Sequence, residues 1–183
     1  MSDEPIPFTS EAIKALASPL RRRILRQLGN HGPATSTTIA TALGHNSGTT
    51  SYHLRLLAKA GFIEELPERA KGRERWWRLI PADRRMPDPA DLSDADRSAA
   101  SELLRARLTE DLTMMASFLN AGNELHDWAE GSRGRSHLTK EELRAFHDDY
   151  VALLRRYSKP PEDASPGARP IMLRWYGFPD PDA

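Results

Sequence analysis

Two short helical patterns joined by a glycine turn constrain the fold of this chain more than any other feature. The first covers residues 36–43, where Ser36 can act as the cap, and the second covers residues 47–60. Their inward-facing positions are Ile39, Ala40 and Leu43, and then Thr50, Leu54 and Leu57. Gly44 ends the first helix, and Asn46 or Ser47 can cap the second. Short helices separated by a glycine-containing turn of about three or four residues predict a helix-turn-helix unit.

The second of these helices has a polar face opposite its packing face. This face contains Gly48, Tyr52, Arg55 and Lys59, flanked by Ser47 and Ser51. Small residues permit a close approach, while hydroxyls and an arginine can bond base edges or phosphates. The helix N-terminus also favours phosphate. The pattern therefore predicts a helix that enters the major groove of DNA. An ordinary amphipathic helix with a Ser/Thr-rich first turn is the alternative.

A longer helix precedes this unit, in the segment "SPLRRRILRQLGNHG". Ser18 is suited to the N-cap and Pro19 to the first helical position. Its apolar residues recur every four positions, at Leu20, Ile24 and Leu28. The other faces carry Arg21, Arg22, Arg23 and Arg26. These arginines indicate either a solvated helix surface or a set of phosphate contacts.

The segment that follows changes from helical to strand periodicity. Residues 62–66 and 73–80 are strand-like and flank a polar turn that ends at Gly72, which predicts a β-hairpin. Its basic residues are Arg69, Lys71, Arg73 and Arg75. We expect them to contact the DNA backbone or the minor groove, with a solvated turn as the alternative. Trp76 and Trp77 point to opposite faces, one of them towards the core.

Four motifs together resemble the winged helix-turn-helix of the ArsR family of bacterial transcriptional regulators. They are "ALASPLRRRILRQL", "TIATALG", "TTSYHLRLLAKAGFI" and "GRERWWRL", all within residues 10–82. The resemblance implies a dimeric DNA-binding protein, usually a repressor that a ligand releases. It also implies that the residues matching the family's DNA-contacting positions approach the DNA. These are Ser47, Thr49, Ser51, Tyr52 and His53. Many members have histidine where Tyr52 stands, so base preference would differ.

Charge and composition agree with a nucleic-acid partner. The net charge is zero, but residues 1–85 carry 14 Lys and Arg against 8 Asp and Glu, a net charge of +6, and residues 86–183 carry −6. The chain has no cysteine, which excludes disulfides and thiolate metal sites. Neither a signal peptide nor a membrane-spanning run is apparent, so we expect a cytoplasmic protein. No catalytic residue set or cofactor motif stands out, which predicts a protein that is not an enzyme and binds no cofactor.

The rest of the chain predicts a linker and two further regions. Residues 1–82 form the winged helix-turn-helix domain, and 83–92 the proline-rich linker. Residues 93–131 form a long helix capped by Ser93, and 137–183 a capped helix followed by a strand over 171–178. The apolar stripe that would join two copies is Leu104, Leu108, Leu112, Met115 and Leu119. The predicted class is mainly α with a small β-hairpin wing and a small α/β C-terminal region.

The expected partners are an inverted-repeat DNA operator, a second copy of the chain, and a small-molecule or protein effector, with no membrane. Aromatic residues of the C-terminal region suggest either an effector pocket or core. Two alternatives remain: a winged-helix protein-interaction module, and a metal-responsive sensor. The sensor's ligands would be Glu124, His126, His137 and Glu141, which resemble a zinc site of the family. Gly131 and Gly134 interrupt that helix, and three residues separate the second pair where the family has two.

Overall fold

The computed structural model describes residues 5–70, 72, 74–121 and 127–182. The chain folds into two compact units, the first over residues 1–133 and the second over residues 134–183. The first unit contains nearly all of the hydrophobic core, so the predicted functional helices are positioned there.

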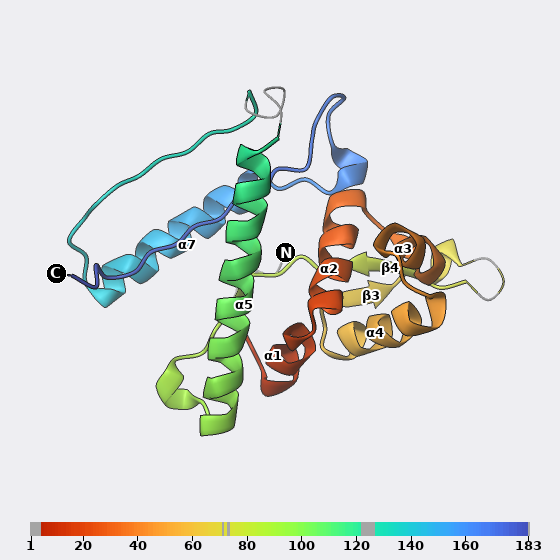
Figure 1. Ribbon diagram of the computed structural model, residues 1–183, viewed down its shortest axis with the longest axis horizontal. Coiled ribbons are helices and arrows are strands. Elements are labelled where there is room, and N and C mark those ends of the chain that lie inside the picture. Colours follow the sequence, from red (N-terminus) through yellow and green to blue (C-terminus); the bar gives the residue numbers. More distant parts are fainter. Residues whose placement is uncertain (1–4, 71, 73, 122–126, 183) are drawn as a thin grey trace. The chain divides into compact units, whose positions relative to one another are not determined.

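The helices formed by the described residues of the first unit pack around one core (Figure 1). They are α1 (Ser10–Ala17), α2 (Pro19–His31), α3 (Ser36–Leu43), α4 (Ser47–Lys59) and α5 (Asp94–Leu119). Thr35, one residue before the predicted Ser36, caps α3 by accepting a hydrogen bond from the Thr38 N–H. Gly44 ends that helix with φ of 70°, a conformation that favours glycine. The predicted pair of short helices with a glycine turn is confirmed.

A small antiparallel sheet lies against these helices. Its strands are β2 (Ala34–Thr35), β4 (Trp76–Leu79) and β3 (Ile63–Glu65), in that spatial order. The hairpin of β3 and β4 was predicted; β2 was not, because a two-residue strand has no readable period. Trp77 is the tryptophan that enters the core, and Trp76 is half-buried. The 3₁₀ helix η1 (Pro67–Arg69) begins the connection between the hairpin strands.

The core joins the helix-turn-helix to the long helix. Its fully buried side chains include Ile13, Leu16, Ile24, Leu28, Ile39, Leu54 and Leu57, together with Leu103 of α5. Figure 1 shows α1 beside α5 and α2, and the hydroxyl of Ser10 on α1 donates to Asp96 of α5 at 2.7 Å. The long helix is therefore part of the same packed unit as the predicted DNA-reading helix.

The predicted linker is ordered by the N-terminal segment. Strand β1 (Ile6–Pro7) pairs in parallel with β5 (Arg84–Arg85), and η2 (Pro89–Asp91) follows. Next to β1, Phe8 is buried with its ring centroid 6.3 Å from that of Phe62. Part of the predicted linker over 83–92 is therefore held to the N-terminal segment by strand pairing. A sequence reading could not find this pairing because the two strands are short and far apart in the chain.

The long helix is shorter than expected. It begins after the Ser93 cap, as predicted, but ends at Leu119 with Asn120 as the C-cap, whereas the prediction extended to residue 131. Residues 127–131, which the structure describes, are not helical. Asparagine and glycine follow Leu119, and both are poor helix formers that favour a helix end.

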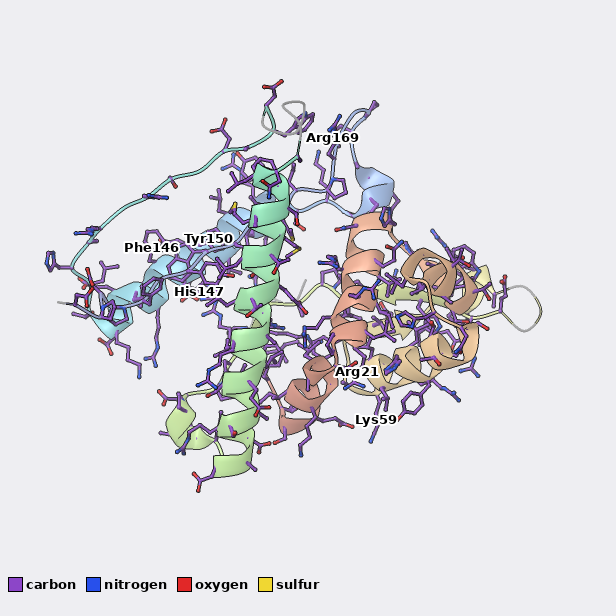
Figure 2. The ribbon with its side chains drawn as sticks, viewed as in Figure 1. Arg21, Lys59, Phe146, His147, Tyr150 and Arg169 are labelled. Carbon is purple, nitrogen blue, oxygen red and sulfur yellow. The ribbon has the colours of Figure 1, made fainter. Side chains whose placement is uncertain are left out.

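The second unit is built on α7 (Lys140–Tyr157). Thr139 and Glu142 form the predicted capping box, and η3 (Pro161–Asp163) follows the helix. Residues 171–178, all described, form no strand, so the predicted α/β character of this region is wrong. An isolated segment has no neighbouring strand to satisfy its backbone. Trp175 instead packs on α7, with its ring centroid 5.6 Å from that of Phe146, 5.2 Å from that of His147 and 6.0 Å from that of Tyr150. These three α7 residues are labelled in Figure 2.

Candidate nucleic-acid interface

Helix α4 is held to its unit by its cap and by one buried face. The Asn46 side-chain oxygen accepts from the Thr49 N–H at 2.7 Å, as predicted for an N-cap. The Thr50 hydroxyl donates to the Asn46 carbonyl at 3.0 Å, which satisfies a hydroxyl that is almost completely buried. Leu54 and Leu57 have no exposed surface. These contacts leave the opposite face of α4 open.

The open face of α4 contains the predicted polar residues. Ser47 and Arg55 are exposed, Tyr52 is 55% exposed, and Thr49 and Ser51 are half-buried. The Arg55 Nε donates weakly to the Ser51 carbonyl within the helix, at 3.3 Å. A guanidinium has five N–H donors, so this contact leaves Arg55 able to bond an acceptor outside the protein.

His53 lies at the edge of this face and contacts the scaffold. Its Nδ1 is 3.5 Å from Nη1 of Arg21 on α2, and the Tyr52 ring meets its ring edge-on with centroids 5.4 Å apart. Because a guanidinium can only donate, the contact requires the tautomer with an unprotonated Nδ1. Burial, and then the charges of Arg21 and His45, lower the pKa of His53. His53 therefore favours the neutral form here.

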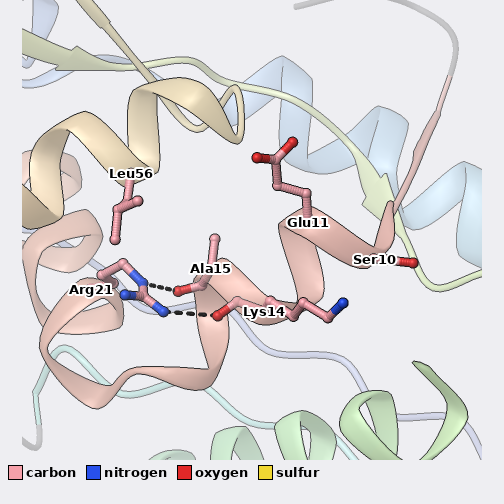
Figure 3. Close-up of a pocket in the computed structure, with 6 residues that line it drawn as sticks. All are labelled: Ser10, Glu11, Lys14, Ala15, Arg21 and Leu56. Atoms are coloured by element: carbon pink, nitrogen blue, oxygen red, sulfur yellow. Dashed lines mark hydrogen bonds between the residues drawn. The ribbon is translucent and has the colours of Figure 1, made fainter. Parts of the chain in front are cut away.

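Lys59, also on the predicted polar face, is paired with a neighbouring helix. Its Nζ lies 2.9 Å from a carboxylate oxygen of Glu11 on α1. That hydrogen bond and the carboxylate charge raise the pKa of Lys59. A pocket of about 490 Å³ lies beside this pair (Figure 3). It is lined by Ser10, Glu11, Lys14, Ala15, Arg21 and Leu56.

The hairpin carries part of the predicted basic set. Arg69 and Arg75 are exposed; the Arg69 guanidinium lies 5.9 Å from the ring centroid of Trp76, and Arg75 pairs with Glu65 at 3.5 Å. Exposed pairs of this kind contribute little to stability, about 0–1 kcal/mol. Both side chains therefore remain able to exchange their partner for a phosphate. Lys71 and Arg73 lie outside the described residues.

A groove of about 500 Å³ brings the start of α3, helix α4 and the hairpin together. It is lined by Ser36, Thr37, Ser51, Arg55, Glu74, Arg75 and Trp77. Two predicted basic residues, Arg55 and Arg75, thus meet at one surface although they are far apart in the chain. Ser36 and Thr37 also belong to this surface, which the sequence pattern did not predict. Hydroxyls at the first turn of a helix are a signal that could have indicated them.

The structure describes only part of the predicted metal site. Glu124 and His126 lie outside the described residues, while His137 and Glu141 are both exposed. Within the described part of the chain, no group of three His, Asp or Glu side chains is placed to hold a metal ion. In the same part, no helix is both long and apolar enough to cross a membrane. The five residues of the predicted dimer stripe are all exposed on α5.

Comparison with known proteins agrees with this geometry. Residues 16–65 match the family model of a helix-turn-helix domain. The chain contains a helix-turn-helix domain. Together with the β3–β4 hairpin, this domain forms a winged helix-turn-helix, as the sequence predicted. The match begins in α1 and ends in β3, so it includes α4 and excludes α5 and the second unit.

Several solved structures are similar to parts of the chain. A fragment of a possible transcriptional regulatory protein from Mycobacterium bovis is 26% identical, with 54% of this chain and 85% of that one covered and a TM-score of 0.35. The homodimeric winged helix-turn-helix DNA-binding domain of Mb0332 from M. bovis, described as a possible ArsR-family transcriptional regulator, is also 26% identical. The similarity covers 54% of this chain and 73% of the Mb0332 chain, with a TM-score of 0.34.

A third structure is that of NMB1585, a MarR family regulator from Neisseria meningitidis. It is 18% identical, with 76% of this chain and 77% of that one covered and a TM-score of 0.37. These TM-scores are low, so the structural similarities carry no conclusion about function by themselves. No match is found among the curated proteins.

Proposed function

We propose that this chain is a transcriptional regulator of the ArsR type that binds double-stranded DNA sequence-specifically as a homodimer. The observation that supports it best is the open face of α4 beside the hairpin. That face presents hydroxyls, a half-exposed tyrosine and Arg55 on a helix whose other side is fixed in the core. A rigidly held helix with a small, polar N-terminal half is what the major groove requires.

The residues divide into base-reading and phosphate-binding groups. Ser47, Thr49, Ser51, Tyr52, His53 and Arg55 would enter or flank the major groove, where arginine bonds guanine in a bidentate manner. Arg69, Lys71, Arg73 and Arg75 would bind the backbone or the adjacent minor groove. In this proposal, the sugar-phosphate backbone of one DNA strand would lie in the groove between α3, α4 and the hairpin.

The homodimer would form through α5. Leu104, Leu108, Leu112, Met115 and Leu119 are spaced three or four residues apart and are 45–64% exposed. An apolar stripe of this length is unfavourable in water and fits a second protein surface. The same stripe on a second copy would pair with it and place two reading helices on an inverted repeat, about one DNA turn apart.

Regulation would act by changing the spacing or orientation of the two reading helices of the dimer. We assign the protein the role of a repressor, controlled by a small-molecule or protein effector, on the basis of the ArsR resemblance. An effector needs only to favour one dimer geometry over another to change operator affinity. No enzymatic step and no cofactor is part of this proposal.

Selection of DNA from a random pool, followed by gel shifts of the selected duplex and its scrambled version, tests the proposed function. We expect a palindromic site bound at least ~10³-fold more tightly than the scrambled duplex, with binding that weakens steeply as salt rises. Equal binding of both duplexes would refute sequence-specific reading and favour a protein-interaction module. An operator affinity that changes with a chelator would favour the metal-sensor alternative.

A further inference from the structure

Two adjacent arginines in the first turn of α2 bond the C-terminal end of α1. Arg21 Nη2 donates to the Lys14 carbonyl at 2.8 Å, and its Nε donates to the Ala15 carbonyl. Arg22 Nη1 donates to the carbonyls of Leu16 at 2.6 Å and Ala17 at 3.1 Å. The last four carbonyls of a helix have no partner within it. Two side chains therefore satisfy all four in α1.

Arg22 also reaches the long helix. Its Nη2 and Nε donate to the same carboxylate oxygen of Glu110 on α5, at 2.7 and 2.9 Å. The Arg22 side chain is only 10% exposed and that of Glu110 is 37% exposed. Breaking this charge-assisted pair would leave the largely buried guanidinium of Arg22 without its carboxylate partner.

Arg21 reaches in the other direction, to α4. Its Nη1 contacts His53 at 3.5 Å while its other nitrogens remain on the α1 carbonyls (Figure 3). Burial lowers the pKa of Arg21, although guanidinium stays charged at any ordinary pH. Neighbouring residues of a helix point about 100° apart, so the two side chains diverge towards different partners.

We propose that Arg21 and Arg22 are positioning residues that couple the long helix to the DNA-reading helix through the end of α1. The chain of contacts runs from Glu110 on α5 to Arg22, then to the α1 carbonyls, then to Arg21 and His53 on α4. The contacts are independent of the proposed function; only their consequence for DNA reading depends on it. A shift of α5 in the dimer would reach α4 by this route, in addition to the packed core.

Positions 21 and 22 both require arginine. Each guanidinium bonds two carbonyls of α1 and a third group on another helix, which needs several donors in a fixed plane. A lysine has one nitrogen and cannot span them. The pair also places positive charge at a helix C-terminus, where it is favourable. These contacts explain why the segment "SPLRR" carries two adjacent arginines. The sequence alone had allowed either a solvated surface or phosphate contacts for them.

The test that needs no DNA is a pH titration of His53 in the full-length protein, monitored by NMR. Glu110→Ala removes a group on α5 that does not touch His53. Burial is the main cause of the lowered pKa of His53 and remains in this variant, but we expect a partial rise in that pKa, because Arg21 loses its fixed position when Arg22 relaxes. Glu102→Ala removes an exposed carboxylate from the same helix and should leave the titration unchanged. An unchanged His53 titration in Glu110→Ala would overturn the proposal.

The DNA-dependent test uses the selected operator and a second duplex with one base pair added between its half-sites. In Glu110→Ala, we expect the preference for the native spacing to fall about threefold to tenfold, while thermal unfolding shows a folded protein. A merely structural role would weaken both duplexes equally and leave the preference unchanged, which would overturn the proposal. If the unmodified protein has no operator, the proposed function fails, and the His53 titration still tests the coupling.

Discussion

Helices α4 and α5 pack on the same hydrophobic core but present opposite chemistry to solvent. Helix α4 buries Leu54 and Leu57 and leaves hydroxyls, a tyrosine and an arginine outside. Helix α5 buries Ala100 and Leu103 and leaves a row of leucines and a methionine outside. Each helix therefore uses one face for folding and has one face left for a partner.

The difference between the open faces separates two kinds of partner. Polar groups around a helix N-terminus can bind an anion and can donate hydrogen bonds to acceptors. DNA offers both, because its phosphates are anionic and its base edges in the groove carry acceptors. Exposed apolar side chains at helical spacing suit another protein surface, because their burial removes hydrocarbon from water. Substitutions on each face should thus affect folding, DNA binding and self-association separately.

The largest expected effect is on folding, from a residue on the buried face of α4. Leu54→Ala should lower the free energy of unfolding by about 2–5 kcal/mol, because the cavity cannot fill completely. Leu112→Ala, an equal truncation on the open face of α5, should change it by less than about 1 kcal/mol in dilute protein. Urea denaturation measures both. Equal losses would contradict the assignment of one buried and one open face.

The next effect is on DNA reading. Arg55→Ala should reduce discrimination between the operator and a single-base variant by about 1–3 kcal/mol, because the proposed bidentate contact to a guanine would be lost. Arg78→Ala is the matched control, since Arg78 is an exposed arginine of β4 that is bonded to Glu64. Fluorescence anisotropy at fixed salt measures each affinity. Full discrimination by Arg55→Ala would remove this residue from the reading set.

A smaller effect is expected on self-association. Leu112→Glu places a charge in the middle of the α5 stripe and should weaken the dimer about tenfold or more, while the monomer remains folded. Thr113→Glu adds the same charge at the next exposed position and should change the dissociation constant much less. Sedimentation equilibrium distinguishes them. An unaltered dimer in Leu112→Glu would show that a surface other than this stripe joins the copies.

The smallest effect is a pH dependence from His53. Its folded-state pKa lies below the ordinary value, so its contribution to stability is complete above about pH 6.5 and is lost as pH falls through the lowered pKa. We expect the free energy of unfolding to fall over this range, and His53→Asn to flatten the curve. If His53→Asn leaves the slope of the free energy of unfolding against pH unaltered, other groups cause the pH dependence.

Local sequence signals predicted much of the first unit. Asn46 and Ser93 cap their helices as expected, Gly44 ends α3, and the hairpin forms with Trp77 in the core. These features depend on a few neighbouring residues, whose hydrogen bonds and backbone preferences are readable from the chain. Short strands such as β1 and β2 are not readable in this way, because their partners are distant.

The candidate site was predicted in its residue types but not in its contacts. Arg55 and Arg75 were both selected, and the structure brings them to one groove with Ser36 and Thr37. Arg21 and Arg22 could not be separated from Arg23 by pattern, since all three follow one another. Only folding shows that the first two turn towards α1 and that Glu110 and His53 meet them.

The order of the helices, the packing face of α4 and the polar character of its open face follow from the amino-acid sequence alone. Periodicity and capping are local properties, so they follow from residues a few positions apart. The pairing of the predicted linker with the N-terminal segment and the packing of α5 on the shared core are visible only in the folded chain. Folding also joins α4 to α5 through two arginines, because long-range contacts depend on which surfaces meet when the core is buried.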